Sequence, residues 1–286
     1  MVAIAAAVAG CGSDSLAPSV MPPVVGLTSV FVGAGDIGQC DGPGPFDTAG
    51  LLDLIDGIVF TAGDNAYFHG SPADFAGCYD QTWGRHRFRT RPTPGNHEYE
   101  NPNAAAYFAY FGSAAGPAGL GYYSYNVGSW HVVSLNSETD LRPGSAQLAW
   151  LRDELASSQA LCTIAIWHRP LFTSGPNGPF LPAQEFWRQL YDAGADIVIN
   201  GHEHLYERFA PQDPNGRPDI ARGMRQFIAG TGGAALYPFV GSRPNSEIRQ
   251  SVWGVLKLTL GAGTYSWEFV PVQASGVRDS GSGACH

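Results

Sequence analysis

Short apolar runs and amphipathic segments alternate along the first two thirds of the chain. The apolar runs are rich in β-branched residues and typical of buried strands, at residues 30–33, 57–61, 161–167 and 196–200. A further strand should end near Pro92. The segments between them have the apolar spacing or the capping residues of helices, at residues 47–55, 71–79, 103–111, 145–155 and 182–192. This order predicts an α/β fold that opens with a βαβαβ unit.

The pattern changes beyond Arg225 to strands without intervening helices. These strands are expected at residues 226–229, 253–260 and 264–270. Residues 122–127 and 130–136 should also pair with each other, around a turn at Gly128 and Ser129. We therefore expect a four-layer α/β/β/α sandwich, in which two mixed β-sheets pack together and helices flank them.

Length and composition favour one large domain. The chain has 286 residues, of which 44% are hydrophobic, and this is enough to bury a full core. We expect the domain to cover residues 28–272. Residues 273–286 should form a loose tail unless Cys285 holds them in place. The sequence does not indicate whether the protein is a monomer or an oligomer.

The charge of the chain limits its partners. A formal net charge of −9 opposes a surface for nucleic acid or for an anionic membrane. A small anionic substrate is compatible with this charge if bound cations reverse the local field. Arg85, Arg87, Arg89 and Arg91 would share one face of an extended segment, which is typical of a solvated, ion-paired row.

The amino-terminal residues have the character of an export signal. Residues 1–10 are apolar and alanine-rich but too short to span a bilayer, and Cys11 follows directly. The run 8–11, Val-Ala-Gly-Cys, resembles a bacterial lipobox. We expect residues 1–11 to be the remnant of this signal, a lipid anchor at Cys11, and a flexible Ser/Pro-rich tether at residues 12–27. The protein would then be exported to the cell envelope; an ordinary secretory segment, leading to the periplasm or the medium, is the alternative.

The remaining cysteines form an even set. In an exported chain, Cys40, Cys78, Cys162 and Cys285 are expected to form disulfides. Cys40 and Cys78 follow two loops that should lie at the same sheet edge, so this pair is our first choice. Cys162 with Cys285 is the second. Metal ligation by these thiols is disfavoured because none has CxxC spacing.

Five short islands of potential metal ligands occur in order along the chain. Most follow apolar runs, and the ends of strands are where sites form in α/β sheets. A Gly-Asp pair alone is more often a turn, whereas two histidines flanking one residue are rarely explained by a core or a turn. Together the islands contain carboxylates, a phenol and imidazoles, which are the ligands that two-metal phosphoester hydrolysis requires. The islands are Gly35-Asp36, Gly63-Asp64-Asn65-Ala66-Tyr67, Gly95-Asn96-His97-Glu98, Trp167-His168-Arg169 and Gly201-His202-Glu203-His204.

This series resembles the motifs of purple acid phosphatases within the calcineurin-like metallophosphoesterases, over roughly residues 30–270. The resemblance implies the metallophosphoesterase fold and a phosphatase that hydrolyses small phosphomonoesters; together with the amino-terminal segment, this predicts an exported phosphatase. It also implies Fe(III) in the site of Tyr67, with zinc, manganese or Fe(II) in the second site. The implied ligands are Asp36, Tyr67 and His204 for the first metal, Asn96, His168 and His202 for the second, and Asp64 as the bridge between them.

Further residues receive roles by the same resemblance. His97 is the best candidate to contact the phosphate or to protonate the leaving group, and Glu98 could orient His97 or a ligand. Many purple acid phosphatases have substrate-contacting histidines between the motifs of His168 and His202, but this interval contains none, and its stretch 174–178 offers only Ser174 and Asn177. His69 is an alternative acid. We expect Glu207 and Arg208 to support the loop of His202 and His204.

Two other functions remain open at this stage. A phosphodiesterase or nucleotide pyrophosphatase could use the same pair of metals. A metal-binding surface protein without turnover is the alternative from a different class. The absence of a histidine between His168 and His202 favours this alternative. Hydrolysis of aryl phosphate, compared with bis-aryl phosphate, separates the three.

Overall fold

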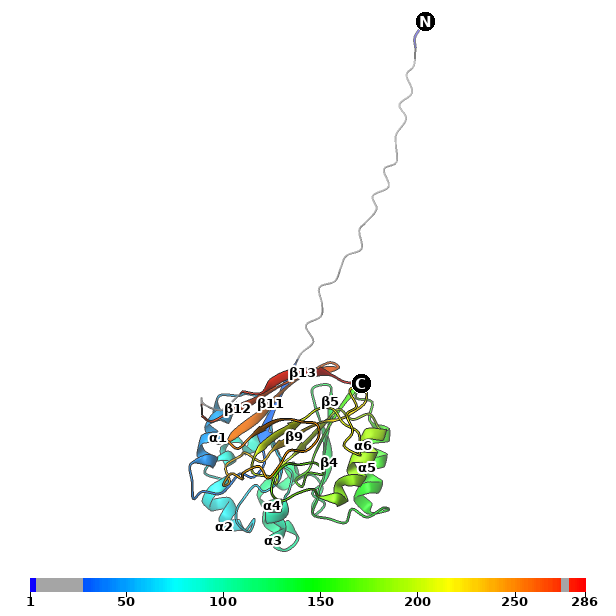
Figure 1. The fold of residues 1–286 in the computed structure, drawn as a ribbon. Coiled ribbons are helices and arrows are strands. Elements are labelled where there is room, and N and C mark those ends of the chain that lie inside the picture. The colour runs from blue at the N-terminus through cyan, green and yellow to red at the C-terminus, as the bar shows by residue number, and fades with distance from the viewer. Residues whose placement is uncertain (4–27, 274–277) are drawn as a thin grey trace.

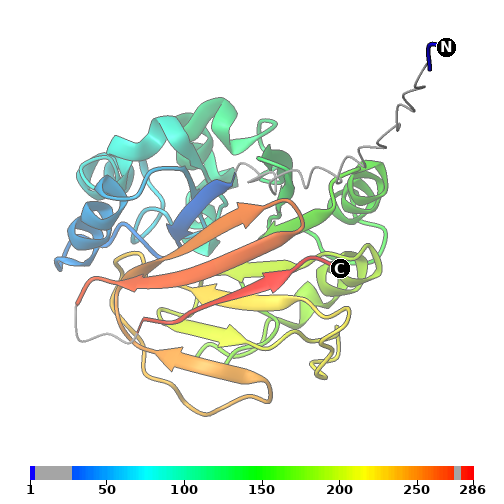
Figure 2. The ribbon, with the colours of Figure 1, turned by 90° about the horizontal axis from the view of Figure 1, so that it is seen from above.

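Two β-sheets face each other at the centre of the molecule, and helices cover their outer faces (Figure 1). The computed structural model describes residues 1–3, 28–273 and 278–286. Most of the expected signal, Cys11 and the tether to residue 27 lie outside these residues. Seen from above, helices α1 to α4 lie on one side of the sheets and α5 and α6 on the other (Figure 2). The expected α/β/β/α sandwich is confirmed.

The first sheet has six strands and the second has seven, and each mixes parallel with antiparallel pairs. In spatial order, the first sheet consists of β13 (Ser280–Ala284), β12 (Thr264–Pro271), β11 (Gly254–Gly261), β1 (Ser29–Ala34), β2 (Ile58–Thr61) and β3 (Thr90–Arg91). The second consists of β10 (Ser246–Gln250), β8 (Tyr206–Phe209), β9 (Arg225–Ala229), β7 (Ile197–Asn200), β6 (Cys162–Ile166), β5 (Trp130–Ser134) and β4 (Tyr123–Val127).

The helices lie close to their expected positions. Ser71 caps α2 through a reciprocal capping box with Asp74, as its sequence indicates. Ser145 occupies the N-cap position of α5, but its side chain makes no capping hydrogen bond. The α-helices are α1 (Gly44–Asp53), α2 (Pro72–Asp74), α3 (Asn96–Glu100), α4 (Ala105–Phe111), α5 (Ala146–Ser157) and α6 (Gln184–Asp192). A π-helical turn covers Phe75–Tyr79, and 3₁₀ turns cover Trp83–Arg89, Pro102–Ala104, Gly112–Ala115 and Leu181–Ala183.

Three apolar layers hold this sandwich together. The layer between the sheets contains large buried side chains such as Phe31, Trp130 and Trp267. A second layer joins the first sheet to α1 and the helices after β2 and β3, and a third joins the second sheet to α5 and α6. Burial of apolar surface in these layers is the main stabilising contribution.

The carboxyl ends of strands from both sheets meet at one edge. Within the first sheet, the N–H of Asp36 donates to the carbonyl of Gly63 at 3.0 Å. Within the second, the N–H of Gly201 donates to the carbonyl of His168 at 3.0 Å. The sheets are joined where His168 Nδ1 hydrogen-bonds to the Ala62 carbonyl at 2.8 Å. The loops after β1, β2, β6 and β7 therefore surround one location.

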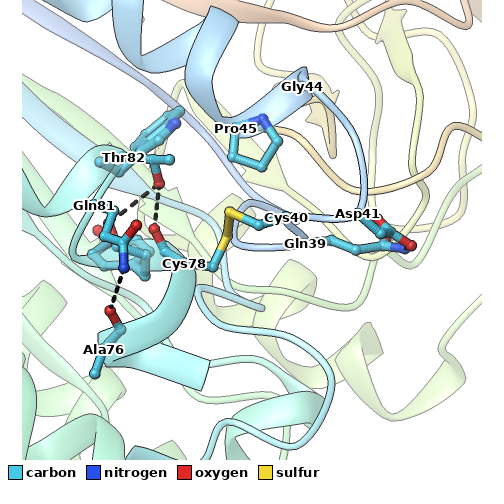
Figure 3. Close-up of a disulfide and its surroundings, with 12 residues drawn as sticks. Gln39, Cys40, Asp41, Gly44, Pro45, Ala76, Cys78, Gln81 and Thr82 are labelled. Carbon is cyan, nitrogen blue, oxygen red and sulfur yellow. Dashed lines mark hydrogen bonds between the residues drawn. A yellow bond between two sulfur atoms is a disulfide. The ribbon is translucent and has the colours of Figure 1, made fainter. Parts of the chain in front are cut away.

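Both expected disulfides are present. Cys40 and Cys78 are joined with their Cα atoms 5.6 Å apart, and they link the loop after β1 to the helical segment after β2 (Figure 3). Cys162 and Cys285 are joined with their Cα atoms 5.5 Å apart. The first bridge braces two loops of the site edge. The second connects β6 of one sheet to the segment after β13 of the other.

The exception that the expectation made for Cys285 applies, and the described carboxyl-terminal residues are not a loose tail. Residues 280–284 form β13, which pairs with β12 along its length. The disulfide at Cys285 and a hydrogen bond from the Phe269 N–H to the Asp279 carbonyl, at 2.8 Å, hold its two ends. Pairing and cross-linking therefore order a segment whose Ser and Gly residues have little preference for a strand.

The segment of Arg85, Arg87 and Arg89 is not extended, so the condition for a shared arginine face is not met. Residues 83–89 form a 3₁₀ helix, which turns the arginines in different directions. Arg85 pairs with Asp53 at 2.7 Å, and Arg89 donates to the carbonyls of Leu52 and Ile55 at the end of α1. Hydrogen bonding to the open carbonyls of a helix terminus is thus what fixes this segment.

Candidate metal centre

The first group of candidate ligands surrounds the phenol of Tyr67. Its hydroxyl lies 2.9 Å from Asp36 Oδ1, 3.2 Å from Asp64 Oδ2 and 3.1 Å from His204 Nε2. His204 Nε2 also lies 3.3 Å from Asp36 Oδ1. All four side chains are buried. Two carboxylates, a phenol and an imidazole therefore converge on one point.

The second group shares Asp64 with the first. Asp64 Oδ2 lies 3.0 Å from His168 Nε2, and His202 Nδ1 lies 3.2 Å from the same nitrogen of His168. Ligand atoms of these three residues all lie within 4.8 Å of one another. A single oxygen of Asp64 thus faces both groups, which is the position that a bridging ligand would need.

Three of the candidate ligands have a left-handed backbone. The φ angle is 59° at Asp36, 50° at Asp64 and 70° at His202. This conformation disfavours residues with a Cβ atom and occurs at functional sites where the surrounding structure holds it. Glycine permits the close approach: a side chain at Gly95 would collide with the Asp64 carboxylate, and one at Gly201 would press on Asp36. Sharp turns at the strand ends bring the ligands together.

Asn96 supplies the observation that tests whether metal ions fit. It begins α3, and the N–H of the next residue, His97, donates to Asp64 Oδ1 at 2.9 Å. The Oδ1 atom of Asn96 is buried and has no hydrogen-bond partner among the described residues. A buried amide oxygen without a partner is costly, and a cation would satisfy it. Together with carboxylate, phenol and imidazole donors, this residue fits a pair of metal ions.

Negative charge dominates the electrostatics of the centre. Burial opposes a charge on His168, but Asp64 and Asp36 outweigh it and raise the pKa of His168 to about 10. Burial and then the same carboxylates raise the pKa of the Tyr67 phenol well above its usual value. Burial beside the positive His168 lowers the pKa of His202 to about 3. The carboxylates thus retain protons on nearby ligands, and bound cations would displace those protons.

Glu98 connects the loops after β2 and β3 through hydrogen bonds. Its Oε1 accepts hydrogen bonds from the N–H groups of Asn65 at 2.7 Å and Ala66 at 3.2 Å, and its Oε2 accepts from Gly95 at 2.7 Å. Burial and then the negative charge of Asp64 raise the pKa of Glu98 to about 8. Glu98 therefore holds the backbone on both sides of the centre.

His97 lies at the open side of the centre, with a side chain that is 24% exposed. Its ring packs on Tyr67, and its Nε2 lies 3.8 Å from Asp64 Oδ2. Its Nδ1 bonds to the carbonyl of Phe68 and lies 3.2 Å from Glu100 Oε1. Because both of these partners are acceptors, Nδ1 carries a hydrogen and Nε2 is the nitrogen turned to the site.

Two other predicted residues have defined partners. His69 is exposed and pairs with Glu100 at 2.7 Å, so it and His97 share one carboxylate. The amide of Asn177 donates to the His202 carbonyl at 2.9 Å, which ties the loop before α6 to the ligand loop. The side-chain nitrogen of Asn177 is therefore already engaged with protein.

Glu207 and Arg208 hold segments next to the ligand loop. Glu207 Oε2 accepts from the N–H of Ser174 at 2.8 Å, and its Oε1 accepts from the Ser174 hydroxyl. Arg208 Nε donates to Asp279 Oδ2 at 2.7 Å, and the same guanidinium pairs with Glu247. These contacts are directed to neighbouring protein segments.

Sequence reasoning missed Glu100, Tyr237 and Glu138. Glu100 lies three residues after His97 on α3, a spacing that could have revealed the contact. Tyr237 stacks on His204 with ring centroids 4.0 Å apart, while His204 Nδ1 bonds to the Ala235 carbonyl at 2.7 Å. This leaves His204 Nε2 turned to the site. Tyr237 comes from a distant loop and has no local signal in the sequence.

Comparison with known proteins identifies the family. The family model described as "Calcineurin-like phosphoesterase" matches residues 30–206, which include all of the candidate ligands. The chain belongs to the calcineurin-like phosphoesterases, and within them it is purple acid phosphatase-like. Membership of this family implies metal ions at the site.

Curated relatives include plant and human proteins. The chain is 30% identical over 248 residues to "Purple acid phosphatase 18" of Arabidopsis thaliana, a match that covers 78% of this chain and 54% of that protein. It is 29% identical over 210 residues to "Acid phosphatase type 7" of Homo sapiens, a match that covers 60% of this chain and 47% of that protein. The chain thus spans about half the length of these two relatives.

Solved structures support the fold. A purple acid phosphatase from yellow lupin (Lupinus luteus) seeds superposes with a TM-score of 0.77 at 22% identity, covering 90% of this chain and 54% of that one. The Plasmodium protein described as the anchor in the inner membrane complex superposes with a TM-score of 0.70 at 14% identity. This match covers 91% of this chain and 89% of that one. At these identities the likeness shows the fold alone.

Two findings bear on location. None of the helices in the described parts of the chain is both long enough and apolar enough to cross a membrane. The two disulfides are typical of an oxidising, extracellular-type environment.

Proposed function

We propose that the protein hydrolyses phosphomonoesters at a centre of two metal ions. The observation that carries this proposal is the position of Asp64 Oδ2, which lies 3.2 Å from the Tyr67 hydroxyl and 3.0 Å from His168 Nε2. One carboxylate oxygen therefore faces two separate groups of ligands. The likeness to purple acid phosphatases supports the same reaction.

The chain's residues divide into two ligand sets. Asp64 would be shared by the two sets, and Tyr67 would provide a phenolate that suits Fe(III). Zinc, manganese or Fe(II) would occupy the second site. Metal ions in these two sites would lower the pKa of water and neutralise charge on the phosphate oxygens. Asp36, Tyr67 and His204 would hold the first ion, and Asn96, His168 and His202 the second.

His97 is assigned the proton transfer to the leaving group. Its Nδ1 is fixed by the Phe68 carbonyl and Glu100, so the proton to be donated would be carried on Nε2, the nitrogen that faces Asp64. Glu98 keeps the loops on both sides in register through its three backbone hydrogen bonds.

Substrate preference and chelation test the proposal directly. We expect the purified protein to hydrolyse aryl phosphate faster than bis-aryl phosphate, to lose turnover after chelation, and to regain it when metal is restored. A faster reaction with bis-aryl phosphate would favour the phosphodiesterase or pyrophosphatase alternative. Two bound metals without turnover of either substrate would favour a metal-binding surface protein.

The visible spectrum tests the assignment of iron. A Tyr67 phenolate bound to Fe(III) should give a violet charge-transfer band. We expect Tyr67→Phe to abolish this band, while Tyr237→Phe, which alters the ring stacked on His204, should retain it. An unchanged band in Tyr67→Phe would contradict the phenolate assignment.

Export with a lipid anchor is the remaining part of the proposal. The disulfides support passage to an oxidising compartment, whereas Cys11 and its surroundings lie outside the described residues. We expect intact mass spectrometry of the mature protein to find a chain that begins with a lipidated Cys11. A mature chain without this cysteine, or with it unmodified, would reject the anchor.

A further inference from the structure

Arg169 directly follows His168, and its guanidinium reaches the edge of the metal centre. Nε donates to both carboxylate oxygens of Glu138, at 2.9 and 3.1 Å. The guanidinium carbon lies 5.6 Å from the centroid of the Phe180 ring. The side chain of Glu138 is only 11% exposed and that of Arg169 is 28% exposed. A carboxylate and an aromatic face thus hold this arginine in place.

One outer nitrogen of this guanidinium lies beside a candidate ligand. Nη1 lies 3.5 Å from His202 Nε2. Among the described residues, no oxygen atom accepts a hydrogen bond from Nη1 or Nη2 of Arg169. Four N–H donors of a permanently charged group are therefore unused by protein oxygens at the rim of the site.

The contact with His202 is long. The 3.5 Å between Nη1 and Nε2 is at the limit of a hydrogen bond, and Nη2 has no protein acceptor among the described residues. The side chain of Arg169 is 28% exposed, so an acceptor from outside the protein can reach these nitrogens.

We infer that Arg169 binds the non-bridging oxygens of the substrate phosphate and selects dianionic phosphomonoesters over diesters. This inference rests on the proposed function. A guanidinium fork matches two phosphate oxygens, and a monoester presents more charge to it than a diester, in which an ester group replaces one of those oxygens. Arg169 would thus supply a substrate contact in a chain that has no histidine between His168 and His202.

Arg169→Gln tests the inference in the metal-loaded protein. We expect KM for aryl phosphate to rise about 10- to 100-fold with little change in kcat, because a charge-assisted contact to the ground-state phosphate is lost. Isothermal titration with inorganic phosphate should show a similar rise in Kd. The kcat/KM for bis-aryl phosphate should change less than about threefold, since a diester uses this contact less. Metal content per chain should be unchanged.

Two further variants complete the experiment. Arg169→Lys keeps the charge but loses the planar fork, so its KM and phosphate Kd should lie between those of the wild type and Arg169→Gln. Arg152→Gln removes an arginine from an exposed pair with Asp153 on α5 and should leave every parameter unchanged. If Arg169→Gln fails to fold, the lysine variant alone decides.

Failure of this inference and failure of the proposed function give different results. Unchanged KM and phosphate Kd in a wild-type enzyme that turns over would overturn the role of Arg169 and leave the phosphatase intact. Lost metal, or equal losses with both substrates, would also overturn it, because Arg169 would then only position His202. Absence of turnover in the wild type would reject the proposed function, while the phosphate titration would still decide whether Arg169 binds phosphate.

Discussion

At the residue scale, the two oxygens of Asp64 have separate tasks. Oδ1 accepts the N–H of His97 at 2.9 Å, which fixes the rotation of the carboxylate. Oδ2 is then directed between Tyr67 and His168. The backbone of Asp64, in the loop after β2, is left-handed, with a φ angle of 50°. The unusual backbone conformation therefore occurs at the residue whose carboxylate faces both groups of ligands.

Replacing His97 should affect poor leaving groups most. If its Nε2 protonates the departing oxygen, His97→Asn should lower kcat about 100- to 10,000-fold for alkyl phosphates. Nitrophenyl phosphate should lose much less, since nitrophenolate departs without a proton. Steady-state kinetics with a series of leaving groups measures this difference.

The comparison has an internal control. His69→Asn removes the neighbour that shares Glu100 with His97, yet His69 is exposed and does not contact Asp64. We expect this variant to retain most of kcat with both kinds of substrate. Equal losses for alkyl and nitrophenyl phosphates in His97→Asn would mean that His97 binds the phosphate and does not protonate the leaving group.

Replacing Glu98 should weaken metal binding without removing a ligand. Glu98→Gln replaces one acceptor oxygen with an NH₂ group, so a backbone N–H of the loops after β2 and β3 loses its partner. Loss of such an orienting contact lowers metal affinity by about 10- to 100-fold. Competition with a chelator measures the change, with Glu185→Gln as the control, because the partner of Glu185 is Arg188 on the same helix. Unchanged affinity would show that the loops hold their shape without Glu98.

At the scale of elements, strands with strong local signals could be predicted and those without could not. The β-branched runs of β1, β2, β6 and β7 indicate buried parallel strands, and these four are confirmed. β10 and β13 are polar, with every residue of β13 Ser, Gly or Ala. β10 is ordered by pairing with β8, which is distant in the sequence, and β13 by pairing with the preceding strand, β12. The strand propensity of the individual residues does not predict such pairing.

Asp279 anchors β13 to the second sheet. It accepts hydrogen bonds from Arg208 Nε and from the Tyr206 hydroxyl, both at 2.7 Å. Burial alone would raise the pKa of Asp279, but these two donors hold it below its usual value. We expect Asp279→Asn to lower the free energy of unfolding at pH 7 by about 1–3 kcal/mol.

The pH dependence of this effect has a defined sign. A carboxyl group with a lowered pKa in the folded state stabilises above its unfolded pKa, near 4, and this contribution is lost as pH falls through the folded pKa. Urea unfolding should therefore show the gap between wild type and Asp279→Asn at pH 7 and a smaller gap below about pH 4. A gap independent of pH would show that the charge of Asp279 is unimportant.

At the scale of the whole molecule, the carboxyl terminus joins the two sheets. The Cys162–Cys285 bridge spans a sequence separation of 123, whereas the Cys40–Cys78 bridge spans 38. Removing a disulfide costs about 2–5 kcal/mol, and more for the longer loop. We expect Cys162→Ala with Cys285→Ala to destabilise the protein by roughly 1 kcal/mol more than Cys40→Ala with Cys78→Ala. Denaturation midpoints of the two double variants measure this; equal or reversed losses would contradict it.

The centre as a whole was predictable because fold topology gathers its islands. Asp36, Asp64, His168 and His202 follow strands whose carboxyl ends share an edge, so their order along the chain was sufficient to predict that they meet. The contact between Arg169 and Glu138 was not predictable. It depends on the side-by-side positions of the loops after β5 and β6, and on a rotamer that no spacing rule specifies.

The metal content of Asp64→Ala, measured together with aryl phosphate turnover, tests the central claim most directly. We expect two metal ions per wild-type chain, and loss of both metal occupancy and turnover in Asp64→Ala. Asp153→Ala, which alters an exposed carboxylate, should behave as the wild type. Retained turnover in Asp64→Ala would contradict a two-metal centre bridged by this residue.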